Sequence, residues 1–201
     1  MTALTTPHQD WLKVDSLKAR ALDVATELIA SRGADGVNVR DIAEFLNTGP
    51  SSLYYYFKSK DALLAEVAAQ GFRRLEAKVA ASLNDGRGWA PIRACGAAYF
   101  GFMRDNPMLY KVMYSERLLA QFEVVREAER AASETFARLI ATGIDGADAE
   151  DGALALWAFG RGVAALAIAS ETNEAGSGRE LTRRLVHGLE VLMGRRIRGE
   201  D

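Results

Sequence analysis

Serines, tyrosines and lysines crowd into one short stretch of the sequence, GPSSLYYYFKSK, which covers residues 49–60. Small hydroxyls can approach base edges, and tyrosine hydroxyls can reach phosphates while their rings pack against sugars. Lysines add point charges suited to a nucleic-acid backbone. A protein core would exclude the lysines, and a solvated face would not need four aromatic rings. The stretch therefore predicts a surface that meets something flat and negatively charged, such as a duplex groove.

Two short helices are expected to position these groups. Asn38 suits the N-cap of a helix whose apolar residues share one side, and Pro50 suits the first position of the next helix, which ends near Phe57. Gly49 is expected to supply the tight turn before it. Helices joined by about four residues form a helix-turn-helix pattern, in which the second helix enters the DNA major groove. We therefore expect Leu53 and Phe57 to pack inward against the preceding helix.

The outward side of this pattern supplies predicted DNA contacts. Lys58, Lys60 and Arg40 are expected to contact the DNA backbone. Two alternatives stay open, because Lys58 can serve solubility alone and Arg40 can pair with Glu44, a contact worth only about 0.3 kcal/mol. The residues expected to point outward from the turn and the second helix are Thr48, Ser51, Ser52, Tyr55 and Tyr56.

Residues 18–67 also resemble the DNA-binding domain of the TetR family of bacterial transcriptional regulators, through ALDVATELIASRG, VRDIAEFL and SSLYYYFKSKDALL. The resemblance implies an all-helical homodimer whose first three helices read an operator. It implies phosphate contacts from Tyr54, Tyr55 and Lys60, and base contacts from the turn and the start of the third helix, which include Gly49 and Pro50. For Tyr54 the alternative is packing in the domain core. Many members have Gly-Val-Ser-Lys where this chain has Asn-Thr-Gly-Pro at 47–50, so that lysine contact is not carried over.

Helical spacing continues along the chain and predicts an all-α fold. A three-helix DNA-binding domain, residues 1–65, is expected to be joined by a long fourth helix, with Ser59 at its start, to a ligand-binding and dimerisation domain, residues 66–201. Ser177–Glu180, SGRE, fits a capping box for the last helix. The predicted helices span residues 16–32, a segment after 38, 50–57, 60–83, 91–104, 107–114, 117–142, 148–170 and a segment from 177 onward.

Composition limits the classes of function. The chain has 201 residues, a net charge of −2 and one cysteine, Cys95, so neither a disulfide nor a cysteine metal site is expected. Residues 1–70 hold seven Lys and Arg against nine Asp and Glu, so DNA binding would depend on a local patch and a dimer. The N-terminus lacks a secretion signal, and the apolar segment 153–169 is interrupted by Arg161, so we expect a cytoplasmic protein with no membrane span, metal or cofactor.

Aromatic and methionine side chains gather in the second half of the chain, where they predict core packing or a cavity for a small hydrophobic effector. The runs AAYFGFMRDNPMLYKVMYS and LWAFGRGVAALA resemble the ligand-binding domain of one TetR branch, with Arg161 where histidine is usual. Arg161 is expected to pair with an internal acid such as Asp105 or Glu116, to meet an anionic group of the effector, or to lie at a dimer interface. The predicted ligand-binding residues are Tyr99, Phe102, Met103, Tyr110, Met113, Tyr114, Phe122, Trp157 and Arg161.

The last two predicted helices suit dimerisation. One carries the small residues Gly160, Gly162, Ala164 and Ala165, and the other a stripe at Leu181, Leu185, Leu189 and Leu192. The alternative is that both stripes are used within one protomer. An effector that shifts the fourth helix would then change the spacing of two recognition helices and release a palindromic operator.

Two other classes of function were weighed. GRGVAA, residues 160–165, has the outline of a dinucleotide-binding fingerprint, but the residues before it are helical in pattern and no other strand–helix–strand unit is predicted. A ligand-independent or architectural DNA binder would need more positive charge than this chain carries. We therefore predict a regulator and no enzyme.

Overall fold

The computed structural model describes residues 8–82, 89–141, 149–171 and 177–197, and every regular element in these ranges is an α-helix. The all-α prediction is confirmed. The helices are α1 (His8–Arg32), α2 (Val39–Phe45), α3 (Pro50–Tyr56), α4 (Lys60–Ala80), α5 (Trp89–Asp105), α6 (Pro107–Met113), α7 (Glu116–Gln121), α8 (Glu123–Ala141), α9 (Ala149–Glu171) and α10 (Ser177–Ile197).

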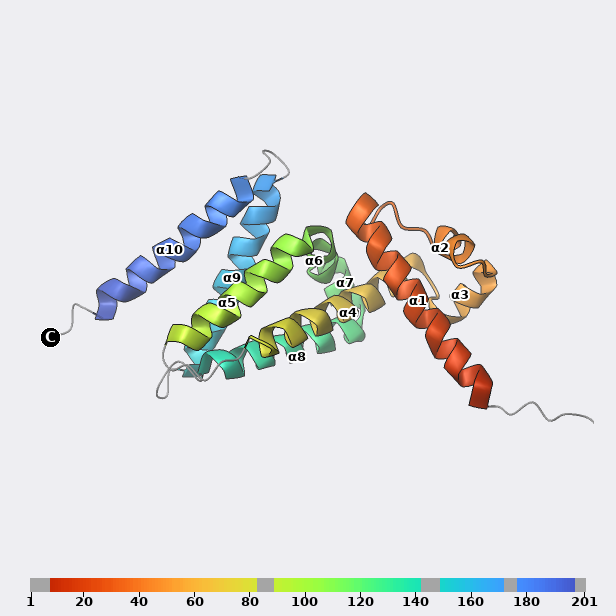
Figure 1. The fold of residues 1–201 in the computed structure, drawn as a ribbon, viewed down its shortest axis with the longest axis horizontal. Helices are drawn as coiled ribbons and strands as arrows, with labels where there is room; N and C mark the ends of the chain where they lie inside the picture. The colour runs from red at the N-terminus through yellow and green to blue at the C-terminus, as the bar shows by residue number, and fades with distance from the viewer. Residues whose placement is uncertain (1–7, 83–88, 142–148, 172–176, 198–201) are drawn as a thin grey trace, which may run out of the picture. The chain divides into compact units, whose positions relative to one another are not determined.

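The chain forms two compact units (Figure 1). Unit 1 contains residues 1–76 and 106–132, and unit 2 contains residues 77–105 and 133–201. The helices α4 and α8 each contribute residues to both units. Unit 1 therefore combines the predicted DNA-binding helices with α6 and α7, which come much later in the sequence. The predicted functional boundary after residue 65 stays a prediction.

Helix α1 supplies the base on which the first helices of unit 1 pack. It begins at His8, earlier than the predicted residue 16, and it contacts α2, α3 and α6. Ala21, Ala25 and Ile29, spaced four residues apart, are fully buried. The helix ends as predicted at Gly33, whose φ of 72° suits glycine and whose N–H donates to the Ile29 carbonyl at 2.9 Å.

The helices α1 and α4 are linked by two ion pairs. Lys18 donates to Glu66 at 2.8 Å, and Arg74 lies 3.4 Å from Asp23. Gly71 allows close packing of α4 on α6, because a Cβ at this position would lie 2.7 Å from the Met113 Sδ atom. The α4 helix is thereby fixed to both neighbours within unit 1.

The single helix predicted for residues 117–142 is wrong, because the chain breaks at Phe122 into α7 and α8. The Arg126 guanidinium closes the end of α7 by donating to the carbonyls of Leu119 at 2.8 Å and Ala120 at 2.9 Å, and it also pairs with Glu123. A side chain several residues downstream thus satisfies carbonyls that an uninterrupted helix would have bonded internally.

In unit 2, α9 packs against α5 and α10. Gly160 in α9 faces Tyr99 of α5, and a Cβ there would lie 3.5 Å from the Tyr99 ring. Of the described helices, α9 is the one long and apolar enough to cross a membrane by length and composition alone, over Glu150–Ser170. One face of it is buried within unit 2, through Ala153, Val163 and Ala164 among others, as in the core helix of a globular domain.

Candidate nucleic-acid interface and ligand-binding residues

The turn between α2 and α3 is built around Asn47. The Asn47 N–H donates to the Glu44 carbonyl at 3.0 Å, and the Thr48 N–H donates to the Ala43 carbonyl at 2.9 Å, the pair of bonds that defines a Schellman motif. Asn47 has a φ of 50°, which asparagine tolerates better than most residues. The prediction that Gly49 supplies the turn is wrong in this respect, since its φ is −71° and its backbone is extended.

The start of each short helix follows from local sequence. The Asn38 side chain accepts a hydrogen bond from the Arg40 N–H at 3.0 Å and caps α2 as predicted. Pro50 occupies the first position of α3, where no N–H is needed. The Ser59 Oγ accepts from the Ala62 N–H at 3.1 Å, so its predicted place at the start of α4 is confirmed.

Leu53 and Phe57 form the inner side of α3, with 0% and 1% of their surface exposed. They share the core of this region with Ile42 and Leu46, the apolar residues of α2 and its C-cap. Because positions four apart lie on one face of a helix, burying these two side chains turns the intervening tyrosines outward. The predicted inward packing of Leu53 and Phe57 is confirmed.

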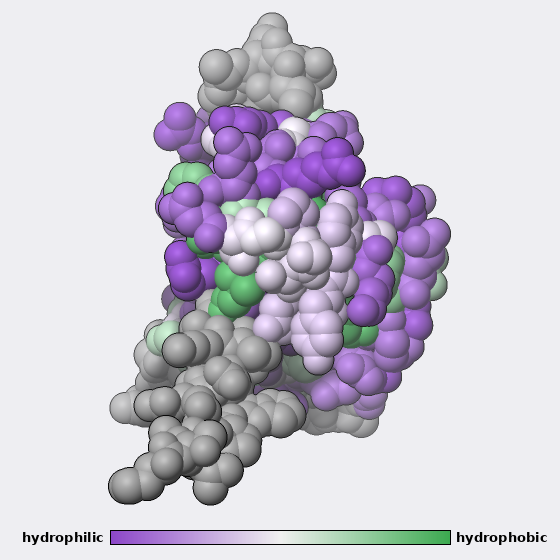
Figure 2. Space-filling view, turned by 90° about the vertical axis from the view of Figure 1, so that its right-hand side faces the viewer, coloured by the Kyte–Doolittle hydropathy of each residue, from purple (hydrophilic) through white to green (hydrophobic). Residues whose placement is uncertain are grey.

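The outward side of α3 is aromatic and uncharged. Tyr55 is 72% exposed and Tyr54 is 41% exposed, so Tyr54 is not a core residue. The Tyr55 and Tyr56 rings meet edge to face at a centroid distance of 5.2 Å, and the Lys58 Nζ lies 5.7 Å from the Tyr55 centroid. Figure 2, which looks onto the side where α2 and α3 lie in Figure 1, shows a pale area of intermediate hydropathy bordered by purple hydrophilic side chains and by smaller green hydrophobic ones.

Basic side chains flank this face. Arg40 and Lys58 are exposed, at the start of α2 and just after α3. Lys60 is half-buried and its Nζ donates to the Asp35 carbonyl at 2.9 Å, which ties the start of α4 to the loop before α2. The geometry thus leaves Arg40 and Lys58 pointing to solvent and gives Lys60 a structural bond that the sequence did not suggest. The remaining predicted contact residues are exposed at Gly49, Pro50 and Ser51 and half-buried at Thr48, Ser52 and Tyr56.

The predicted ligand-binding residues divide between the two units. In unit 2, Tyr99 and Trp157 pack with Phe136, which is not among the predicted ligand-binding residues. The ring centroids lie 5.7 Å apart for Tyr99 and Trp157, 6.1 Å for Tyr99 and Phe136, and 5.1 Å for Phe136 and Trp157. All three side chains are buried, as are Phe102 and Met103. This aromatic cluster is part of the core of unit 2, and its contact with an effector stays a prediction.

Four of the other predicted ligand-binding residues belong to unit 1, namely Tyr110, Met113, Tyr114 and Phe122, whereas Arg161 belongs to unit 2. The Tyr114 ring contacts Phe72 of α4 at a centroid distance of 5.1 Å and Tyr110 at 4.6 Å. Met113 is fully buried against Gly71, and Phe122 is half-buried at the break between α7 and α8. Met113 and Tyr114 thus pack α6 and its C-cap against α4. Arg117 of α7 also pairs with Asp61 of α4, at 2.9 Å.

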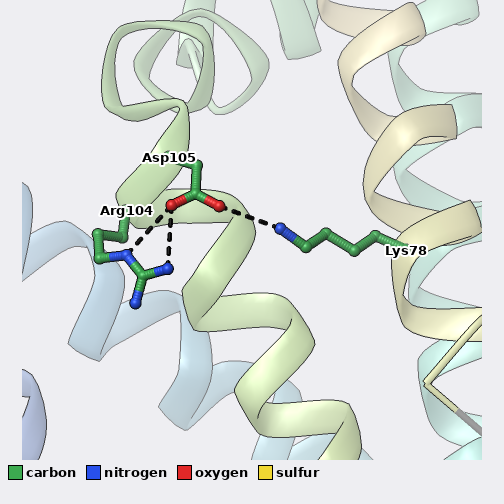
Figure 3. A network of polar contacts seen from close by, with 3 residues as sticks. All are labelled: Lys78, Arg104 and Asp105. Carbon is green, nitrogen blue, oxygen red and sulfur yellow. Dashed lines mark hydrogen bonds and ion pairs between the residues drawn. The ribbon is translucent and has the colours of Figure 1, made fainter.

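Arg161 is exposed on α9. Asp105, one of its predicted partners, is held by other side chains (Figure 3). Lys78 lies 3.2 Å from one carboxylate oxygen, and the Arg104 Nε and terminal nitrogen lie 3.1 and 3.0 Å from the other. The hydrogen bonds from Lys78, and then from Arg104, lower the pKa of Asp105.

The helix α9 has a second, outward face. Leu154 and Leu166 are 66% and 54% exposed, and Arg161 and Gly162 lie exposed between them. A Cβ added at Gly162 would meet nothing within 4 Å. Of the small residues predicted to allow helix approach, Gly160 and Ala164 instead face the interior of unit 2, and Gly162 and Ala165 face outward. GRGVAA lies wholly inside α9, so it does not form the strand-to-helix turn of a dinucleotide site.

Two family models match the sequence. The model of bacterial regulatory proteins of the tetR family matches residues 21–67, which contain about half of α1, all of α2 and α3, and the start of α4. The model of the tetracyclin repressor-like C-terminal domain matches residues 92–189. The chain belongs to the TetR family of bacterial regulatory proteins.

Relatives of this TetR-family chain include two regulators and many solved structures. It is 29% identical over 90 residues to an uncharacterised HTH-type transcriptional regulator, YobS of Bacillus subtilis, covering 45% of this chain and 47% of YobS. It is 27% identical over 130 residues to the HTH-type transcriptional repressor KstR of Mycolicibacterium smegmatis, covering 63% and 64%. The chain thus matches about half to two thirds of these relatives' lengths. A regulator structure from Saccharomonospora viridis in complex with choline aligns with a TM-score of 0.64 and 23% identity, over 88% of this chain and 96% of the other.

Family membership gives the departure at residues 47–50 a structural meaning. This TetR-family chain uses Asn47 in place of the glycine usual at the left-handed position, and Pro50 in place of the usual lysine. The recognition helix therefore begins with a rigid ring and carries no charge of its own between Pro50 and Tyr56. The signal for the turn was present in the sequence, since asparagine is the residue that most often replaces glycine there.

Proposed function

We propose that this protein is a sequence-specific DNA-binding transcriptional regulator whose α3 enters the major groove. The observation that carries the proposal is the outward face of α3. Leu53 and Phe57 anchor the helix, and Tyr54 and Tyr55 stand exposed. Lys58 lies beside the Tyr55 ring, and Arg40 is exposed at the start of α2. Phosphate contacts would supply affinity, and groups on α3 would supply sequence discrimination. Membership of a regulator family and the fold of its neighbours support the same function.

Homodimerisation is part of this proposal. The outward face of α9 exposes Leu154, Leu166 and four alanines beside Gly162, and α10 packs alongside with Leu181 and Leu185 half-buried. An apolar helix face of this kind is costly to leave in water and suits a twofold pairing with a second copy. The side chains of Leu189 and Leu192 lie outside the described residues. A dimer would place two α3 helices on half-sites about 34–36 Å apart, as a palindromic operator requires.

The dimer face is tested by placing a charge on it. Gly162→Glu puts a carboxylate on the outward face of α9, where the protomer itself leaves open space. Gly96→Glu in α5 is the matched control, because that helical glycine also has nothing within 4 Å of an added Cβ. Sedimentation velocity should show monomers for Gly162→Glu and dimers for Gly96→Glu. A dimeric Gly162→Glu protein would rule out pairing through this face.

The proposed effector is small and hydrophobic. The protein is proposed to be a repressor that leaves its operator when the effector binds. The aromatic cluster of Tyr99, Phe136 and Trp157 supports an apolar wall, and the relative named as a repressor supports the direction of control. A neighbour of the same fold was solved with choline, which shows only that such a fold holds a small molecule. The exposed position of Arg161 favours the dimer interface over contact with an anionic effector.

The role of Arg161 is tested by separating two measurements. If Arg161 serves the dimer, Arg161→Ala should change the dimer dissociation constant and leave effector affinity unchanged. Loss of effector affinity in a protein that stays folded and dimeric would instead assign Arg161 to the effector.

Coupling would run through α4, whose residues belong to both units. A typical coupling free energy is about 1–3 kcal/mol and is reciprocal, so operator DNA should weaken effector binding by the same factor as effector weakens operator binding. Isothermal titration of effector into free and operator-bound protein measures both directions. Equal effector affinity in the two titrations would exclude effector-driven release.

DNA binding itself is tested by selecting bound sequences from a random pool at near-physiological salt. The regulator, which we place in the cytoplasm, should enrich a palindromic sequence. Its affinity for that DNA should fall steeply as the salt concentration rises, because phosphate contacts release counterions. An enriched pool without symmetry would point to a ligand-independent or architectural binder. A pool with no enriched sequence would end the regulator proposal.

A further inference from the structure

The side-chain chemistry of α3 is unusual for a recognition helix. From Thr48 to Phe57 no residue carries a charge or a side-chain amide. Its exposed side chains are the Pro50 ring, the Ser51 hydroxyl and the rings of Tyr54 and Tyr55. The exposed side chains of α3 itself therefore offer rings and hydroxyls alone.

Each of the four bases presents a different set of hydrogen-bonding and apolar groups in the major groove. Guanine is best read by arginine or lysine, adenine by asparagine or glutamine, and the cytosine amino group by a carboxylate. None of these side chains is present between Thr48 and Phe57. Hydroxyls bond to several bases and discriminate little. Thymine alone presents a methyl group, which apolar side chains contact directly.

We propose that α3 reads its DNA half-site mainly through thymine methyl groups, with the rings of Tyr55 and Pro50 as the apolar contacts. This role for Tyr55 replaces the phosphate contact that the family resemblance implies. The ligand of this surface is then B-form DNA with thymines clustered at the α3 footprint. This inference rests on the proposed function and names the sequence class that the same surface prefers.

The two rings are fixed before DNA arrives. Pro50 has a closed ring at the first position of α3. Tyr55 is held by the edge-to-face contact with Tyr56 at 5.2 Å, with the Lys58 Nζ at 5.7 Å from its centroid. An apolar contact made by a fixed ring loses little side-chain entropy on binding. Arg40 and Lys58, which flank the face, would act on phosphates and so contribute equally to all sequences.

The first experiment removes only methyl groups. Half-sites selected from a random pool are resynthesised with deoxyuridine for thymidine. In parallel they are resynthesised with 7-deazaguanine for guanine, which removes N7, one of the two acceptors that arginine reads. Binding of the full-length protein is measured by fluorescence anisotropy. We expect an affinity loss of about tenfold or more with deoxyuridine and of no more than about twofold with 7-deazaguanine. Deoxyuridine placed only outside the half-sites should change nothing.

Each other outcome is decisive. A large loss with 7-deazaguanine and none with deoxyuridine would overturn the methyl readout while leaving sequence-specific binding intact. A pool that enriches no sequence would overturn the proposed function, and this inference with it.

The second experiment assigns the readout to a residue. Tyr55→Ala removes a ring that is 72% exposed, so the fold should persist. The ratio of thymine to uracil affinity should fall to about twofold or less in this variant. Arg40→Ala is the control, since it should weaken binding to both DNAs equally and keep the wild-type ratio. An unchanged ratio in Tyr55→Ala, together with an unchanged ratio in Pro50→Ser, would overturn the assignment to these rings.

Discussion

On α3, Tyr54 and Tyr55 stand in solvent, whereas in unit 2 the rings of Tyr99 and Trp157 are buried against Phe136. Both regions are aromatic stretches of α-helix. The difference lies in what else shares each helix. On α3, Leu53 and Phe57 already fill the inner face, so the tyrosines have no interior left to occupy. Aromatic content therefore predicts a function only after the inner face of the helix has been assigned.

The largest expected effect is on the free energy of unfolding, when one aromatic ring is removed from each region in turn. Phe136→Ala removes a ring that is 5% exposed and leaves a cavity beside Trp157, so it should lower the free energy of unfolding by about 3–5 kcal/mol. Tyr55→Ala should change it by less than about 0.5 kcal/mol, because its ring is exposed. Urea denaturation followed by circular dichroism measures both.

Comparable losses in the two variants would break the comparison, because Tyr55 would then be a structural residue. A small loss in Phe136→Ala would instead show that the unit 2 cluster is loosely packed, as an effector cavity requires.

The second prediction concerns access to unit 2. Burial raises the pKa of the Cys95 thiol from 9.0 to about 12, so its thiolate fraction near neutral pH falls about 1000-fold. A thiol reagent at pH 8 should therefore label the native protein at least about 100-fold more slowly than the urea-unfolded protein. Between pH 9 and 12 the unfolded thiol loses its proton while the folded thiol keeps it, so Cys95 should lower stability as pH rises through that window.

Cys95 is the single cysteine of the chain, so the labelling rate reports one site. Effector that seals unit 2 should slow labelling further. Native labelling as fast as unfolded labelling would show that this region opens freely, and the contrast with the exposed face of α3 would be lost.

The third prediction tests how the outward position of α3 is set. Asn47→Val places a β-branched residue at a φ of 50°, which should cost about 1–2 kcal/mol of stability. Asn47→Gly should be neutral or stabilising by less than about 1 kcal/mol. Thermal unfolding of the two variants and the wild type measures the strain in the turn. The unfolding temperature of the wild type should lie between those of the two variants. A stable Asn47→Val protein would mean that the turn does not fix α3.

Local signals allowed much of this fold to be predicted. The caps at Asn38 and Ser59, the proline start of α3 and the glycine end of α1 each depend on a few adjacent residues, and each is present. The inner face of α3 followed from four-residue spacing alone.

What failed depended on side-chain and helix contacts that residue type and spacing do not specify. The break at Phe122 is closed by Arg126, and neither glycine nor proline marks it. Gly160 and Ala164 are buried because α9 packs within unit 2, where it contacts α5. The spacing of small residues along α9 does not reveal which of its faces is buried. Lys60 is drawn to the Asp35 carbonyl by the fold of the preceding loop. Residue type therefore predicted the candidate DNA surface better than the interior of unit 2.

The smallest expected effect concerns Asp105, whose carboxylate is exposed and held by Lys78 and Arg104 (Figure 3). An exposed ion pair contributes little to stability, so Lys78→Ala should leave the unfolding midpoint unchanged within error. It should nevertheless raise the pKa of Asp105 toward its ordinary value of 3.8, because the Lys78 hydrogen bond is the largest cause of the lowered pKa. Arg161→Ala is the matched control. If Arg161 were the partner of Asp105, as one reading of the sequence allowed, that variant would raise the pKa by a similar amount, and NMR titration of the carboxyl carbon distinguishes the two results.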